Sequence, residues 1–66
     1  MVDKEEVRNA LEKEYGQAWD TNQLQQDFIV HGFLAPYVVV TNKETRKKGT
    51  LMFTHMPRFY YSWKED

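Results

Sequence analysis

Few side chains in this sequence could carry out catalysis. Histidine is the side-chain type that titrates near neutral pH, and the chain has two, His31 and His55. No third metal ligand stands at a recognisable spacing from them, and Ser62, the one serine, lies outside any nucleophile motif. Cysteine is absent, and the three glycines are too scattered to form a phosphate-binding loop. We therefore expect no enzymatic activity, no catalytic residue, no cofactor, no metal site and no small-molecule substrate.

Basic and aromatic side chains in the second half are better candidates for a functional surface. Six of them are predicted to bind a partner: Arg46, Lys47, Lys48, Arg58, Tyr60 and Lys64. The first three fall in an expected loop, and strand alternation places the other three on one face of the last expected strand. Cations beside a ring could hold single-stranded nucleic acid through charge and stacking. The net charge of −1 argues against this, because nucleic-acid-binding domains are usually basic.

An apolar sheet surface is the other kind of binding site that the sequence predicts. The segment YVVV at residues 37–40 is apolar on both faces, so a helix that covers one face leaves apolar side chains on the other. A small monomer rarely exposes such a patch unless it binds something. The competing interpretation is that the first helix covers one face and the termini cover the rest. We expect a protein partner or a homo-oligomer, and single-stranded nucleic acid is the alternative.

The charge is distributed unevenly along the chain. Residues 1–33 carry three basic and seven acidic side chains, a net charge of −4, whereas residues 34–66 carry six basic and three acidic side chains, a net charge of +3. Such polarity can orient a partner or a second copy of the chain. The alternative is a solvated acidic helix beside a hairpin with lysines at its tip.

The first helix is predicted to begin at Asp3 and to end at Gly16. Asp3 and Glu6 have the spacing of a capping box, Val2 and Val7 that of a hydrophobic staple, and glycine readily adopts the left-handed backbone that ends a helix. The helix has a narrow apolar stripe and a charged opposite face. We expect it to cover a core formed elsewhere.

A second, short helix is predicted over residues 21–26. Asp20 and Gln23 repeat the capping box, and Trp19 and Leu24 repeat the staple. This arrangement gives Trp19 a structural role and makes it a poorer candidate for ligand binding.

Four strands are predicted for FIVHGFL, PYVVVTN, GTLMFTHM and RFYYSW. The polar segment NKETRKKG joins the middle two as a hairpin loop, and Pro36 and Pro57 mark the corners. Alternation turns Phe59, Tyr61 and Trp63 toward the core. The predicted fold is α+β, with an N-terminal helix and one short helix packed on a three- to four-stranded, mostly antiparallel meander, and residues 1–66 are expected to form a single domain.

Two segments between Trp19 and Trp63 resemble a known group of sequences. They read W-D-T-x-x-L-Q-x-D-F-x-V-x-G-F-x-A-P-x-V-V-V and G-T-L-x-F-x-H-x-P-R-x-Y, and they are similar to small uncharacterised proteins of cyanobacteria and of the tailed phages that infect them. The resemblance covers about two thirds of the chain and implies no established activity, cofactor or catalytic residue. The related loop carries Asp-Gly where this chain has Thr45-Arg46, which implies a left-handed backbone at Arg46 and a more basic loop. A phage origin would imply a small accessory protein that binds host or virion components.

Length and hydropathy complete the sequence-based expectations. No apolar run approaches the roughly 20 residues that span a bilayer, and the N-terminal segment MVDKEEVRN is charged rather than signal-like. We expect a cytoplasmic protein without a membrane partner. The expected function is that of a non-enzymatic accessory protein that acts by protein–protein interaction or self-association, with single-stranded nucleic-acid binding as the alternative.

Overall fold

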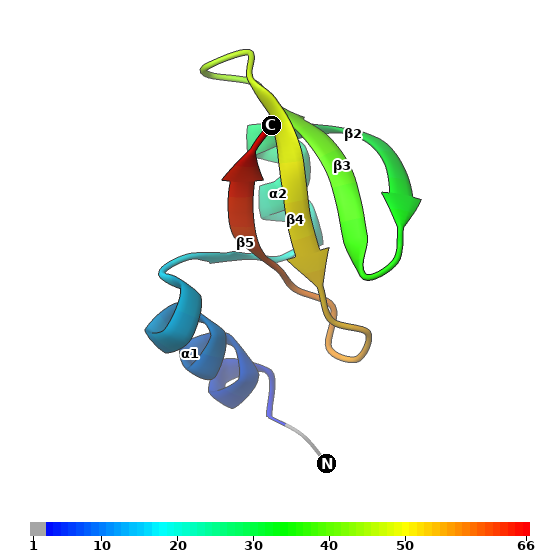
Figure 1. Ribbon diagram of the computed structural model, residues 1–66. Helices are drawn as coiled ribbons and strands as arrows, with labels where there is room; N and C mark the ends of the chain where they lie inside the picture. Colours follow the sequence, from blue (N-terminus) through cyan, green and yellow to red (C-terminus); the bar gives the residue numbers. More distant parts are fainter. Residues whose placement is uncertain (1–2) are drawn as a thin grey trace.

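The computed structural model describes residues 3–66 and confirms the α+β class (Figure 1). The elements are α1 (Lys4–Tyr15), β1 (Ala18–Trp19), α2 (Thr21–Asp27), β2 (Phe28–Leu34), β3 (Tyr37–Asn42), β4 (Lys48–Phe53) and β5 (Tyr60–Glu65). All strand pairs are antiparallel, and the strand order is β1-β5-β4-β3-β2. The last four strands form the predicted meander, but the predicted count of three to four strands is wrong because β1 adds a fifth strand beside β5.

The helix boundaries follow from the capping residues. Asp3 caps α1, although its carboxylate accepts the amide hydrogen of Glu5 at 2.9 Å instead of that of Glu6. Gly16 ends the helix with φ 96°, and its amide donates to the Glu12 carbonyl at 2.9 Å. The predicted staple involves Val2, which lies outside the described residues. The capping box of α2 is confirmed: Asp20 Oδ1 accepts from the Gln23 amide at 2.7 Å, and Gln23 Oε1 accepts from the Asp20 amide at 3.1 Å.

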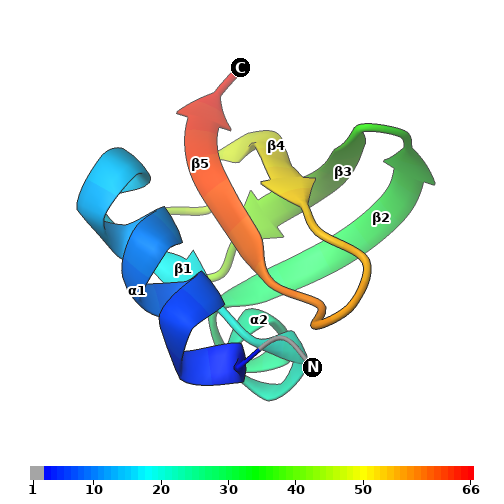
Figure 2. The same cartoon turned by 90° about the horizontal axis from the view of Figure 1, so that it is seen from below.

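The strand register divides the sheet into two faces, which we call inner and outer. Val38, Val40 and Leu51 share the inner face and are fully buried. With them pack Trp19, Leu24, Phe28 and Tyr60. Helix α2 covers this face at the start of β2, whereas α1 lies beside β1 and β5 (Figures 1 and 2). The core therefore lies between the inner face of the sheet and α2.

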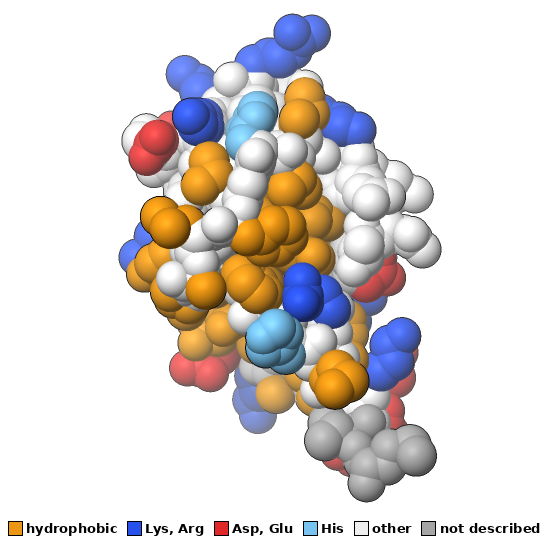
Figure 3. Space-filling model, turned by 90° about the vertical axis from the view of Figure 1, so that its right-hand side faces the viewer, with side chains coloured by type: hydrophobic (Ala, Val, Ile, Leu, Met, Phe, Trp, Pro, Cys, Tyr) orange, Lys and Arg blue, Asp and Glu red, His pale blue; other side chains and the backbone are white. Residues whose placement is uncertain are grey.

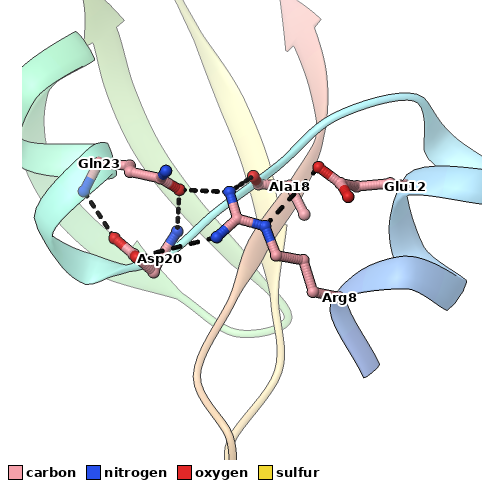
Figure 4. Close-up of polar contacts among 5 residues, drawn as sticks. All are labelled: Arg8, Glu12, Ala18, Asp20 and Gln23. Carbon is pink, nitrogen blue, oxygen red and sulfur yellow. Dashed lines mark hydrogen bonds and ion pairs between the residues drawn. The ribbon is translucent and has the colours of Figure 1, made fainter. Parts of the chain in front are cut away.

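Arg8 joins α1 to the rest of the protein (Figure 4). Its Nη2 donates to the Ala18 carbonyl at 3.1 Å and to Gln23 Oε1 at 2.5 Å. Its guanidinium also lies 3.7 Å from the Glu12 carboxylate and 3.9 Å from that of Asp20. Because Gln23 Oε1 is also part of the α2 capping box, the arginine fastens both helices to β1. This gives β1 a fixed position although it has only two residues.

A bulge in β5 reverses part of the predicted face assignment. Ser62 has φ 59°, and the pairing of β4 with β5 shifts between Thr50 and Met52. A residue added to one strand restarts the side-chain alternation. Tyr60 and Trp63 consequently both face inward, so the prediction of an outward Tyr60 is wrong, and so is that of an inward Tyr61. Tyr61 lies on the outer face.

The turn residues confirm the expected backbone at Arg46, end β4 early and shift the start of β5. Arg46 has φ 65°, the left-handed backbone expected in the loop between β3 and β4. Thr54 ends β4 earlier than predicted, because its Oγ1 donates to the Pro57 carbonyl at 2.7 Å and accepts from the Phe59 amide at 2.9 Å. These bonds organise residues 54–59 as a loop, so β5 begins at Tyr60 instead of Arg58.

Candidate protein-interaction surface

The hairpin formed by β2 and β3 exposes large apolar side chains. Five of them are more than a third exposed, and we call them the hairpin surface: Ile29 (49%), Val30 (37%), Phe33 (54%), Leu34 (72%) and Tyr37 (45%). Figure 3 shows the side of the molecule on which β2 and β3 lie in Figure 1, with hydrophobic side chains gathered between the two histidines and basic side chains at their border. Patches of this kind on small proteins usually mark interaction sites.

The hairpin surface extends over both faces of the sheet. The register pairs Val30 with Val40 and Phe33 with Val38, which places both exposed residues on the inner face. Ile29 is paired with Thr41 and Leu34 with Tyr37, on the outer face. The core therefore continues to the surface along β2, where the described helices no longer cover it.

The hairpin also lacks formal charge. Residues 28–42 contain no lysine, arginine, aspartate or glutamate. Asp27 and Lys43 stand at its two ends, where the Lys43 amide donates to the Asp27 carbonyl at 2.9 Å. Depletion of charge with retention of aromatic and aliphatic side chains is typical of the centre of a protein interface.

The basic residues predicted to bind a partner divide into two groups. Lys48 lies on the outer face, and Lys64 is paired with Thr50 on that same face. Arg46 and Lys47 precede Lys48 in the loop. These four cations therefore gather at one end of the sheet, and Lys64 does not share the face of Tyr60 as the sequence predicted.

Arg58 and Tyr60 lie at the opposite end, about 17 Å away along the six residues of β4. Tyr60 is only 3% exposed and belongs to the core, so it cannot form part of an exposed surface with Arg58. Arg58 instead packs its guanidinium over Phe53 at 4.9 Å from the ring centroid, with Nη2 3.3 Å from His55 Nδ1. Phe53 contacts Phe33 edge-on at 5.3 Å, so Arg58 borders the hairpin surface.

A separate cleft of about 540 Å³ lies between α2 and the loop that follows β3. Trp19 and Phe28 form its apolar part, and the Trp19 indole N–H donates to Asp27 Oδ2 at 2.9 Å. That bond gives Trp19 a structural partner inside the protein. None of the six residues predicted to bind a partner lines this cleft, and Lys43, which does line it, was not among them.

One titratable side chain is clearly perturbed. Burial raises the pKa of the Tyr61 phenol, and the nearby Tyr15 and Glu14 raise it further. Tyr61 lies 4.7 Å from the Tyr15 ring, in the contact between β5 and α1. The raised pKa of Tyr61 is explained by its packing against α1 and does not point to a role in proton transfer.

Sequence reasoning missed most of the hairpin surface. It recognised that Tyr37–Val40 is apolar on both faces, but it did not single out Ile29, Phe33 or Leu34. The signal that could have found them is the run of 15 residues, 28–42, without a charged side chain.

Among residues 3–66, no group of three or more acidic, histidine or cysteine side chains is arranged to hold a metal ion. None of the described helices is long and apolar enough to cross a membrane. Comparison with known proteins gives no match, either to a family model, to a curated protein or to a solved structure.

Proposed function

We propose that this protein acts without chemistry of its own, by binding a protein partner or a second copy of itself through the hairpin surface. The observation that carries the proposal is the exposure of five large apolar side chains on a hairpin without charge. A domain of 66 residues buries a small core. Covering the hairpin surface would extend this core and stabilise the folded state by mass action.

The experiment compares two lysine substitutions at exposed apolar sites. Leu34→Lys places a charge in the hairpin surface, whereas Met56→Lys places one in the loop between β4 and β5, where Met56 is 91% exposed. Sedimentation velocity and pull-down from a cell lysate are performed with each variant and with the wild type. We expect Leu34→Lys to reduce self-association or capture and Met56→Lys to have a smaller effect. A wild-type monomer that captures nothing would contradict the proposal.

Single-stranded nucleic acid is a second candidate because four cations gather at one end of the sheet. Lys48 and Lys64 lie on the outer face, and Tyr37 lies on the same face toward its other end, opposite Met52. Its half-exposed ring could stack on a base farther along the bound strand. Titration of a labelled oligonucleotide at low and moderate salt tests this. Each phosphate contact contributes a slope of about −0.7 on a plot of log affinity against log salt. Lys64→Gln should reduce the slope by about that amount, and absence of binding at low salt eliminates the candidate.

A further inference from the structure

We propose that two copies of this chain pair antiparallel along the outer edges of their β2 strands and form one continuous sheet. This inference rests on the proposed role of the hairpin surface and identifies its partner as a second copy.

The outer edge of β2 is open. Strand order places β2 at the end of the sheet, where it pairs with β3 and with no other strand of residues 3–66. The opposite end of the sheet is different, because β1 is only two residues long and lies beside α1 (Figure 2). A free strand edge presents unpaired amide and carbonyl groups to any second strand.

The usual protection of an edge strand is largely missing from β2. Natural edges carry lysines, prolines or inward-pointing charges that prevent pairing between molecules, and β2 has none of these. It has one bulge, because the register with β3 shifts between Val30 and Gly32. The extra residue, His31, turns to the outer face, where its Nε2 lies 2.6 Å from Thr41 Oγ1. The residues on both sides of the bulge remain in register with β3.

The side-chain pattern of β2 is self-complementary in one register. His31 is the extra residue of the bulge and has no partner in β3, so it is left out of the alternation. The remaining residues divide between the two faces: Ile29, Gly32 and Leu34 lie on the outer face, and Val30 and Phe33 lie on the inner face. A twofold axis through Gly32 then places Ile29 opposite Leu34 of the other copy, and Val30 opposite its Phe33. Each pair shares a face, so all four exposed side chains find an apolar neighbour.

The centre of this arrangement is sterically open. Gly32 stands opposite itself at the axis, and a Cβ at this position would meet no atom of its own chain within 4 Å. In a twofold interface, residue i of one copy contacts residue j of the other, and residue j of the first copy contacts residue i of the second. The pairs given above follow this rule.

Electrostatics also allow a second copy. Because residues 28–42 carry no formal charge, antiparallel pairing of two hairpins brings no like charges together. A partner strand must be apolar on both of its faces, since exposed apolar side chains border the β2 edge on both faces of the sheet. The β2 strand of another copy meets this requirement, because Ile29 and Leu34 lie on its outer face and Val30 and Phe33 on its inner face.

Charge substitution at one cross-strand pair tests the register. Ile29→Glu and Leu34→Lys each replace one member of the pair, and the twofold axis repeats each change. We expect either variant alone to raise the dimer dissociation constant by roughly tenfold in sedimentation equilibrium. The double variant, Ile29→Glu with Leu34→Lys, places opposite charges across both symmetry-related pairs and should recover most of the lost affinity. Both side chains are exposed, so circular dichroism should show that the monomers remain folded.

The other outcomes separate this inference from the proposed function. Self-association that is insensitive to the single variants, or that the double variant does not restore, overturns the β2 register. A wild-type monomer that captures a lysate protein through a Leu34-dependent contact overturns the dimer and leaves the proposed function standing. A monomer that captures nothing overturns both.

Discussion

Close packing of Trp63 against Gly49 makes substitution of that glycine the sharpest test of the fold. A Cβ at Gly49 would lie 2.6 Å from Cη2 and 2.8 Å from Cζ3 of Trp63, and it would also collide with the Lys64 carbonyl oxygen. The ring cannot swing away without losing Phe28, whose ring centroid is 5.2 Å away. The carbonyl cannot move without disturbing the pairing of Gly49 with Glu65. Gly49→Ala should therefore overpack the core.

The loss of stability expected for Gly49→Ala can be expressed as a change in Tm. Overpacking of a core costs about 1–3 kcal/mol. A domain of this size has a free energy of unfolding of roughly 3–10 kcal/mol, and each kcal/mol shifts its Tm by about 4–8 °C. The Tm of Gly49→Ala should therefore fall by about 4–24 °C. The change is a large part of the total stability.

The assay is a thermal melt followed by far-UV circular dichroism at a dilute, fixed protein concentration. Near-UV dichroism of the tryptophans reports whether the Trp63 environment has changed before unfolding. Gly32→Ala is the matched control, because a Cβ there meets nothing within 4 Å and the backbone is not left-handed. This control should change stability by less than about 1 kcal/mol. A Gly49→Ala variant that melts within about 2 °C of the wild type would refute the packing argument.

Three further predictions concern the core, the helix attachment and alkaline stability. Tyr60→Ala should lower the free energy of unfolding by about 3–5 kcal/mol. Trp63→Ala should lower it less, because the Trp63 ring is only half-buried. A lower urea midpoint for Trp63→Ala than for Tyr60→Ala would contradict the bulge at Ser62. Arg8→Met should increase amide hydrogen exchange in α1 while β3 and β4 remain protected, and a uniform increase would contradict the role of Arg8 in attaching α1 to β1 and α2. Burial raises the Tyr61 pKa above 10.0, so this tyrosine stabilises the native state below pH 10.0, and the contribution is lost as the pH rises through the raised pKa. Tyr61→Phe should therefore flatten the alkaline decline of stability in urea titrations, and an unchanged slope would refute this.

Local chemistry made several elements predictable from the sequence. The capping box of α2 is complete within four residues, Asp20 to Gln23, and its geometry is as predicted. Gly16 ends α1, and β2 has the predicted bounds at Phe28–Leu34. These features depend on contacts between residues close in the chain, so the chemistry of the side chains is sufficient to specify them.

The wrongly predicted faces of β5 residues show what a prediction from neighbouring residues alone leaves out. Alternation predicted one face for Phe59, Tyr61 and Trp63, but the bulge at Ser62 is imposed by pairing with β4 and by the fit of Trp63 over Gly49. The partner strand, β4, is separated from β5 by the loop of residues 54–59. A two-residue strand such as β1 likewise has no pattern of its own, and it exists because Arg8 and β5 hold it.

Residue types and their spacing were enough to specify the α+β class, the helix caps, the order of the strands of the meander and the absence of charge from residues 28–42. Packing of the whole chain was needed to end the sheet with an open edge at this uncharged hairpin and to bury Tyr60 in the core. It also separated the basic residues into Arg58 at one end and four cations at the other. The difference arises because caps and alternation act over a few residues. Burial, by contrast, depends on which distant strands and helices come to lie over each face.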